Sequence, residues 1–295
     1  MVAIKKKIVK GQTYYYLEHS IREGKKVQKK EVYLGSKIPS NIEEIKKDFL
    51  DSIHRERWYK DVDKIKQRFS KEQKTVPKSV REKELKNFAI RFTYDTQRIE
   101  GSTLTRRETA DLLERGITPK SKPMSDVQEA EAHRDLFHKI MKSQKDLSLQ
   151  EVLEWHWELF NKTDKAIAGK IRNYRVGIGG SKFVPPSPID VNPMLTEFFQ
   201  WYHKNKNKLH PVELVALAHL KFVTIHPFGN GNGRISRLIM NFILNRKKYP
   251  MLVVPYEERN SYYNALERSQ LKQEDRTFLQ WFVKRYIKEY KKYLR

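Results

Sequence analysis

The side chains best suited to chemistry lie in one short segment, His226 to Arg237, which reads His-Pro-Phe-Gly-Asn-Gly-Asn-Gly-Arg-Ile-Ser-Arg. Gly229, Gly231 and Gly233 permit positive φ and leave their amides free of side chains. An imidazole beside such amides can accept a proton from an attacking hydroxyl while the amides hold an anion. This arrangement predicts a phosphoryl or nucleotidyl transfer site.

Two helices are expected to position this segment. An apolar run over about 211–225 predicts a helix that stops at His226, because a proline disfavours the α region for the residue before it. A second helix is expected over about 234–247, with Arg234 and Arg237 on one face. A glycine-rich loop that feeds a helix N-terminus is a natural anion cradle, and arginines can bind phosphate with two hydrogen bonds.

The segment Thr96-Gln-Arg-Ile-Glu100-Gly101 also draws attention. The periodicity puts Glu100 in the last turn of a helix over about 81–99, with Gly101 as its end. A carboxylate there opposes the negative end of the helix dipole, at a cost of about 0.3–1 kcal/mol if it is unpaired. The residues alone allow either a solvated carboxylate or one paired with a cation.

The segment His226–Arg237 resembles the Fic signature HxFx[D/E]GNGRxxR, and the resemblance extends over about residues 85–290. The resemblance implies that His226 is the general base. It also implies that the loop and the helix after it bind the phosphates of a nucleotide, through Gly229, Gly231, Asn232, Gly233, Arg234 and Arg237.

The stretch 174–186 alternates apolar and other residues around Gly179 and Gly180, which predicts a β-hairpin whose second arm ends at two prolines. It resembles the flap of Fic proteins, which aligns an extended target segment by strand addition. The resemblance assigns this role to Ile178, Gly179, Gly180 and Phe183.

Thr96 to Gly101 resembles the inhibitory motif [S/T]xxxE[G/N] of Fic proteins whose inhibitor precedes the catalytic core. The resemblance implies that Glu100 pairs with Arg237 and removes the partner of the γ-phosphate, with Thr96 as a support. One position departs from the family pattern, since Asn230 stands where an Asp or Glu would hold Mg²⁺. An amide oxygen is a weaker magnesium ligand than a carboxylate.

The expected fold is mainly α: a Fic-type helical bundle with a β-hairpin flap and a small N-terminal β-rich unit. Residues 1–37 are expected to form that basic unit, 38–80 a charged helical linker, and 81–295 the Fic domain with its inhibitory helix and flap. Further helices are expected over about 106–115, 126–143, 149–161, 192–206 and 258–292. Thr105 and Glu108 have capping-box spacing, Gly116 stops that helix, and Pro188 and Pro193 are placed in connections.

Composition bounds the function classes. The chain carries 60 Lys and Arg against 36 Asp and Glu and contains no cysteine, which excludes disulfides and thiolate metal sites. No apolar segment follows the N-terminal lysines, and no apolar stretch reaches the roughly 20 residues that span a bilayer, so a cytoplasmic protein without a membrane segment is expected. The basic balance fits either polyanion binding or charge spread over solvated faces.

The sequence therefore predicts a protein adenylyltransferase that moves AMP from ATP to a Ser, Thr or Tyr hydroxyl of a target protein, with Mg²⁺ as cofactor and Glu100 as its inhibitor. Two alternatives stay open. One is phosphate transfer, and the other is an attenuated Fic protein that acts as a nucleotide sensor or as a DNA-associated regulator. Residues 1–37 could contact nucleic acid, and a homodimer is among the open oligomeric states.

Overall fold

The computed structural model describes residues 2–23 and 26–295. The chain divides into two compact units, Met1–Asp63 and Lys64–Arg295, and the division falls within one long helix. The mainly α architecture expected from the sequence is confirmed. The part boundaries expected at residues 37 and 80 stay predictions.

The first unit contains an antiparallel sheet in the order β1-β2-β3, formed by Ala3–Val9, Gln12–Glu23 and Lys26–Gly35. Lys10 and Gly11, both with positive φ, make the two-residue turn between β1 and β2. Helix α1 (Ile42–Thr75) begins in this unit, and its apolar stripe packs on the sheet around Leu17. The turn expected at Gly24 lies outside the described residues.

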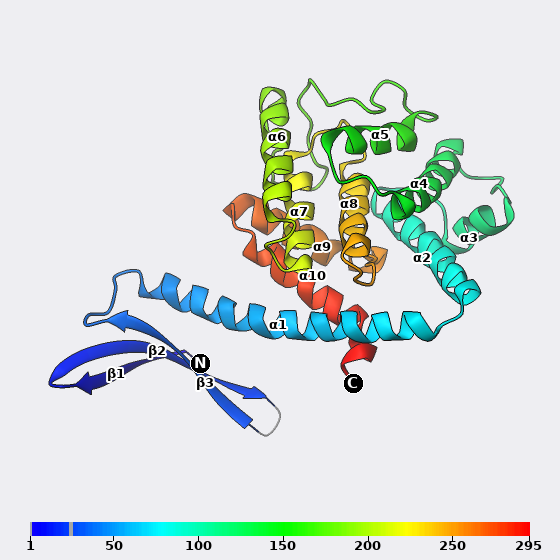
Figure 1. Cartoon of the computed structure of the whole chain (residues 1–295). Helices are drawn as coiled ribbons and strands as arrows, with labels where there is room; N and C mark the ends of the chain where they lie inside the picture. Colours follow the sequence, from blue (N-terminus) through cyan, green and yellow to red (C-terminus); the bar gives the residue numbers. More distant parts are fainter. Residues whose placement is uncertain (1, 24–25) are drawn as a thin grey trace. The chain divides into compact units, whose positions relative to one another are not determined.

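The second unit is helical. Its helices are α2 (Lys78–Ile99), α3 (Arg106–Arg115), α4 (Met124–Lys142), α5 (Leu149–Phe160), α6 (Pro188–Asn205), α7 (Pro211–Ile225), α8 (Asn232–Arg246), α9 (Arg259–Lys272) and α10 (Arg276–Glu289), with 3₁₀ turns at Tyr256–Glu258 and Lys291–Leu294. Helix α7 lies beside α8 (Figure 1), and most of their side chains are buried. These two helices frame residues 226–231, called the signature loop below.

Three local predictions were wrong. The stretch 174–186 contains no strand: a single turn, closed by the hydrogen bond from the Ser181 N–H to the Ile178 carbonyl, stands where a hairpin was expected. The helix expected over 258–292 is two helices, because Gln273 turns left-handed at φ 52°. Pro188 and Pro193 both lie in α6, where Pro188 occupies the first turn that tolerates a missing N–H.

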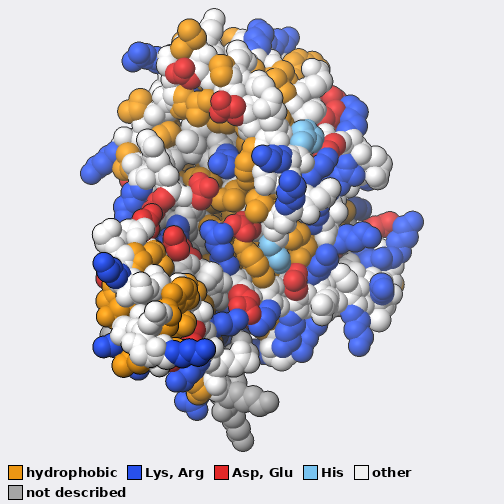
Figure 2. Space-filling model, turned by 60° about the vertical axis from the view of Figure 1, so that its left-hand side comes forward, with side chains coloured by type: hydrophobic (Ala, Val, Ile, Leu, Met, Phe, Trp, Pro, Cys, Tyr) orange, Lys and Arg blue, Asp and Glu red, His pale blue; other side chains and the backbone are white. Residues whose placement is uncertain are grey.

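The surface is polar and mixed in charge. Lys and Arg side chains cover much of the face in Figure 2, with Asp, Glu and hydrophobic groups between them, and a hollow near the middle of that face has hydrophobic walls. Within the described residues, no helix combines the length and the apolar character needed to cross a membrane.

Candidate active site

The signature loop is a tight connection between two buried helices. Helix α7 ends at His226, which adopts the left-handed conformation with φ 52°, and Gly231 at φ 80° is the N-cap of α8. The buried Asn232 amide closes the loop: its Oδ1 accepts the Phe228 N–H at 2.9 Å and its Nδ2 donates to the Phe228 carbonyl at 2.8 Å. The amides of Asn232, Gly233 and Arg234 have no acceptor among the described residues, which leaves them open to an anion.

His226 is oriented by the end of its own helix. Its Nδ1 lies 3.3 Å from the Val223 carbonyl. Because a carbonyl can only accept, this contact assigns the proton to Nδ1 and leaves the Nε2 lone pair free. Burial lowers the pKa of His226 below its ordinary value, and the positive charge of Arg172 acts in the same direction. A neutral imidazole with an open Nε2 can serve as a general base.

A cavity of about 470 Å³ joins the separate parts of the predicted site. Residues from α2, the stretch 174–186, the signature loop, α8 and α9 meet around it. Among the predicted site residues, its walls include Glu100, Ile178, Gly179, Gly180, His226, Gly233 and Arg237. Thr96, Phe183, Gly229, Asn230, Gly231, Asn232 and Arg234 do not line it. Several of these hold the loop from behind.

Glu100 and Arg237 form the ion pair expected from the sequence, with Oε1 and Nη2 2.5 Å apart. Arg237 also donates to the Thr96 carbonyl at 3.3 Å, and its side chain is 1% exposed. Partial burial pushes the pKa of Glu100 upward, but the charges of Arg237 and Arg234 outweigh it and the pKa is lowered overall. Glu100 is therefore a carboxylate at neutral pH.

The Glu100 carboxylate also stands against the N-terminus of α8. A Cβ placed on Gly233 would lie 2.2 Å from Oε1 of Glu100. The carboxylate thus sits beside the open amides and Arg237, where a phosphate would find both hydrogen-bond donors and positive charge. The Glu100 carboxylate, at the C-terminal end of α2, therefore occupies part of the anion-binding site that the loop forms.

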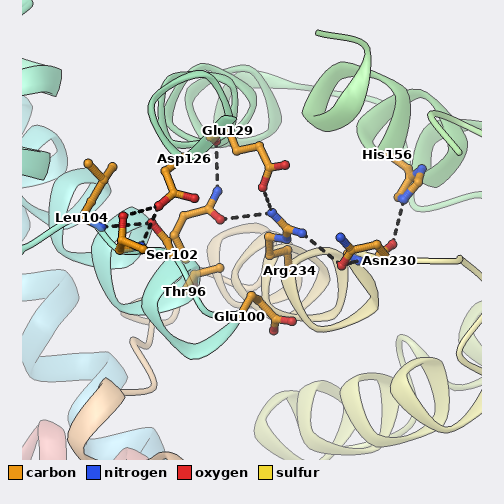
Figure 3. A network of polar contacts seen from close by, with 12 residues as sticks. Thr96, Glu100, Ser102, Leu104, Asp126, Glu129, His156, Asn230 and Arg234 are labelled. Atoms are coloured by element: carbon orange, nitrogen blue, oxygen red, sulfur yellow. Dashed lines mark hydrogen bonds and ion pairs between the residues drawn. The ribbon is translucent and has the colours of Figure 1, made fainter. Parts of the chain in front are cut away.

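Arg234 points away from the cavity into a polar network (Figure 3). Its guanidinium pairs with Glu129 of α4 and donates to Gln97 Oε1 at 3.1 Å and to Asn230 Oδ1 at 3.2 Å. It also lies over the Phe160 ring. In this arrangement Arg234 braces the loop from behind.

Asn230 does not fit a magnesium ligand in this structure. Its Oδ1 accepts the Gly231 N–H at 2.7 Å as well as the Arg234 guanidinium, which uses both lone pairs and places a positive charge beside the oxygen. The described residues contain no cluster of three or more His, Asp or Glu side chains that could hold a metal.

The stretch 174–186 covers one side of the cavity and is tied down at its tip. Glu267 of α9 accepts hydrogen bonds from Ser181 Oγ at 2.9 Å and from the Lys182 N–H at 2.5 Å. Loop and helix therefore form one wall, although no β-ladder stabilises the loop. The name flap is kept below for residues 174–186.

Several supporting residues were not singled out from the sequence. His156 accepts the Gly169 N–H at Nδ1, so its Nε2–H donates to the Asn230 carbonyl at 3.0 Å, and its ring stacks on Phe228. Glu129 and Gln97 hold Arg234. These contacts join positions far apart in the chain, and no local pattern in the sequence marks them.

Substitution of Gly233 by alanine is expected to destabilise the protein by about 1–3 kcal/mol, the usual cost of overpacking. The new Cβ would collide with the Glu100 carboxylate and approach Arg237 Nη1 at 3.1 Å. Thermal denaturation of the wild type, Gly233→Ala, Glu100→Gly and the double variant gives a double-mutant cycle for the free energy of unfolding. The Gly233→Ala penalty should shrink when Glu100 is already glycine; equal penalties in both backgrounds would contradict this placement of the carboxylate.

The chain is similar to proteins of known families. Residues 146–244 match the model of the Fic/DOC family. The protein adenylyltransferase Fic of Drosophila yakuba is 37% identical over 179 residues, and that of Drosophila melanogaster is 36% identical; each match covers 59% of this chain and 36% of the relative. The chain thus spans little more than a third of the length of these curated relatives.

Two solved structures share the fold. A Fic domain containing signaling protein from Bacteroides thetaiotaomicron aligns with a TM-score of 0.69 and 28% identity, over 78% of this chain and 95% of that one. Fic-1 from C. elegans aligns with a TM-score of 0.71 and 26% identity, over 83% of this chain and 72% of that one. Residues 146–244, which include the signature loop and the two helices that frame it, thus match the Fic/DOC family model and lie in a fold shared with solved Fic proteins.

Proposed function

We propose that the protein is an adenylyltransferase that moves AMP from ATP to a hydroxyl of a target protein and is held inactive by Glu100. The observation that carries the proposal is that His226, Arg237 and Gly233 with its open amide line the same cavity. The similarity to relatives named protein adenylyltransferase Fic supports the same chemistry.

In the proposed reaction, Nε2 of His226 takes the proton of a Ser, Thr or Tyr hydroxyl of the target. The oxygen then bonds to the α-phosphorus of ATP, the bond from that phosphorus to the oxygen bridging to the β-phosphate breaks, and pyrophosphate leaves. The amides at the start of α8 stabilise the charge on the phosphates, and Arg237 orients the γ-phosphate. Positioning and charge stabilisation are the main contributions that a protein makes to such transfers.

The proposed inhibition follows from the pairing of Glu100. While its carboxylate holds Arg237, the γ-phosphate has no partner there and meets a negative charge instead. ATP can then bind only with its phosphates displaced from the line of attack. Thr96 contributes through its carbonyl, which accepts a hydrogen bond from Arg237.

The proposal assigns no Mg²⁺ ligand to Asn230, and Mg²⁺ enters it only as an ion that accompanies ATP. Asn230 is engaged by Gly231 and Arg234, so a bound ion would depend on ATP oxygens for its ligands or on a change in the Asn230 rotamer. The steps above use only groups of this chain. The cytoplasmic location and the homodimer stay predictions.

ATP labelled at either the α or the γ phosphate tests the proposed function. Glu100→Gly protein incubated with candidate targets should transfer the α label and release the γ label as pyrophosphate. Transfer of the γ label would indicate phosphate transfer instead. Nucleotide binding without transfer of either label would indicate a sensor.

A second function is favoured by the first unit alone. Residues 1–37 carry ten Lys and Arg against three Asp and Glu. A pocket of about 290 Å³ between the sheet and α1 is lined by six basic or imidazole side chains with Glu56 as its one acidic group: His19, Arg22, Lys30, His54, Arg57 and Lys60. Such a pocket can hold a backbone phosphate, which supports binding of duplex DNA.

Binding of duplex DNA is expected to weaken steeply with salt, because log K decreases with log salt by about 0.9 for each phosphate that the protein neutralises. Arg57→Ala should therefore reduce the slope by about one unit, because Arg57 is exposed at the rim of that pocket. Lys162→Ala, exposed in the second unit, serves as the control and should leave the slope unchanged. Equal slopes for the two variants would contradict the assignment.

A further inference from the structure

Arg172 is a buried arginine whose side chain, among the residues that the structure describes, donates hydrogen bonds to main-chain carbonyls alone. It lies in the loop between α5 and α6 and is 3% exposed. Its Nε donates to the His226 carbonyl at 2.7 Å, Nη1 to the Tyr174 carbonyl at 3.0 Å, and Nη2 to the Pro186 carbonyl at 2.7 Å. Within the described part of the chain it forms no ion pair with a carboxylate.

One of these carbonyls belongs to the proposed base. His226 holds a left-handed backbone, which costs a residue with a Cβ roughly 1–2 kcal/mol. Arg172 supports that conformation twice, through its side chain and through its own N–H, which donates to the Pro227 carbonyl at 3.0 Å. The direction of the imidazole therefore depends on contacts with Arg172.

The other two carbonyls mark the ends of the flap. Tyr174 begins the segment and Pro186 closes it, so the guanidinium fastens the two ends at one point. A Cβ placed on Gly229 would lie 2.1 Å from the Tyr174 hydroxyl, so the base of the flap packs closely against the signature loop. The tip is held separately by Glu267.

We propose that Arg172 is a positioning residue that joins the base of the flap to the His226 backbone through one guanidinium and so sets the distance between a docked target hydroxyl and the imidazole. A planar fork with fixed N–H directions can serve three carbonyls at once, whereas an ammonium on a flexible stem cannot. The inference rests on the proposed transfer reaction for its consequence, while the clamp is a claim about structure alone.

Arg172→Lys in the Glu100→Gly background tests the role. The substitution keeps the charge but loses the fork, so kcat for transfer of the α label should fall about 100-fold, as misplacement by about 1 Å can cost. Nucleotide affinity should stay unchanged, because Arg172 does not line the cavity. Arg285→Lys is the matched control: Arg285, in the last turns of α10, is also buried, but it pairs with the carboxylates of Glu258 and Glu289.

A general loss of stability is separated from a positioning role by a second variant. Arg172→Ala should show the same loss of kcat for transfer. Part of the rate should return when millimolar guanidinium is added, since the free ion can occupy the space that the Arg172 guanidinium leaves beside the three carbonyls. Unchanged kcat in Arg172→Lys, or a parallel loss of nucleotide affinity, would overturn the inference.

Amide hydrogen exchange tests whether Arg172 clamps the flap to the His226 backbone, and this test does not require transfer activity. Absence of transfer in the Glu100→Gly parent would count against the proposed function instead. Amides in 174–186 and in 226–228 should exchange faster in Arg172→Lys than in Arg285→Lys. Unchanged exchange in either stretch would overturn the clamp. Faster exchange with full transfer activity would overturn the positioning role.

Discussion

Glu100→Gly protein is expected to transfer AMP faster than the wild-type protein by roughly a hundredfold or more, the range over which one charge-stabilising donor changes kcat. The substitution frees Arg237, whose Nη2 lies 2.5 Å from the Glu100 carboxylate, to take the γ-phosphate. It also removes a negative charge from the amides beside Gly233. Initial rates of α-label incorporation at saturating ATP give the comparison.

Two further variants make this result specific. Glu100→Gln keeps the size of the side chain but not its charge, and should give an intermediate rate because a neutral amide still occupies space beside Gly233. Glu114→Gln, on an exposed position of α3, should behave as the wild type. A Glu100→Gly rate equal to that of Glu114→Gln would remove the basis for the inhibitory role.

Removal of Glu100 should also change stability in a nucleotide-dependent way. Loss of one partner of a largely buried ion pair costs up to about 3–5 kcal/mol, because it leaves a charge such as that of Arg237 uncompensated. ATP then supplies a new partner. The variant should therefore melt at a lower temperature than the wild type without ATP and gain more from added ATP, as binding to the folded state requires.

His226→Ala in the Glu100→Gly background is expected to lower kcat by roughly 10²–10⁴-fold, the usual contribution of a general base. Nucleotide affinity should change little, because the phosphates are held by amides and Arg237. His219→Ala is not a suitable control, since His219 is buried and hydrogen-bonded to the Tyr262 hydroxyl. His203→Ala, at an exposed position of α6, is the better control.

The pH dependence of the same reaction gives a second measurement on His226. The base works only when neutral, so kcat should fall as pH drops through its pKa. Burial lowers that pKa, so the fall should occur below about 6.5, the unperturbed value. The Glu100 charge acts the other way and raises the pKa, so the Glu100→Gly profile should shift to still lower pH. A profile flat through this range would contradict the assignment of the base.

The parts of the site that the sequence could predict are those with local causes. Proline after His226 ends α7, glycines form the loop, and an apolar stripe defines α8. Gly101 likewise ends α2 so that Glu100 is its C-cap, and Thr105, Glu108 and Gly116 cap α3 as expected. The Glu100–Arg237 pair joins residues far apart in sequence, and only the resemblance to the inhibitory motif pointed to it.

The failures have tertiary causes. Glycines at 179 and 180 predict a turn correctly, but paired arms need a ladder that the flap lacks, and Arg172 and Glu267 fix the flap by other means. No glycine or proline marks the break between α9 and α10; the Ser269 hydroxyl accepts the Phe278 N–H at 3.0 Å and stabilises the start of the second helix. In this structure Arg234 pairs with Glu129 of another helix, and its assignment to phosphate stays a prediction.

A crystal structure of Glu100→Gly protein with a non-hydrolysable ATP analogue tests the central claim most directly. The analogue should lie in the cavity with its γ-phosphate on Arg237, its other phosphates on the amides at the start of α8, and its α-phosphorus facing Nε2 of His226. Phosphates bound elsewhere, or an imidazole turned away from the α-phosphorus, would contradict the proposed reaction.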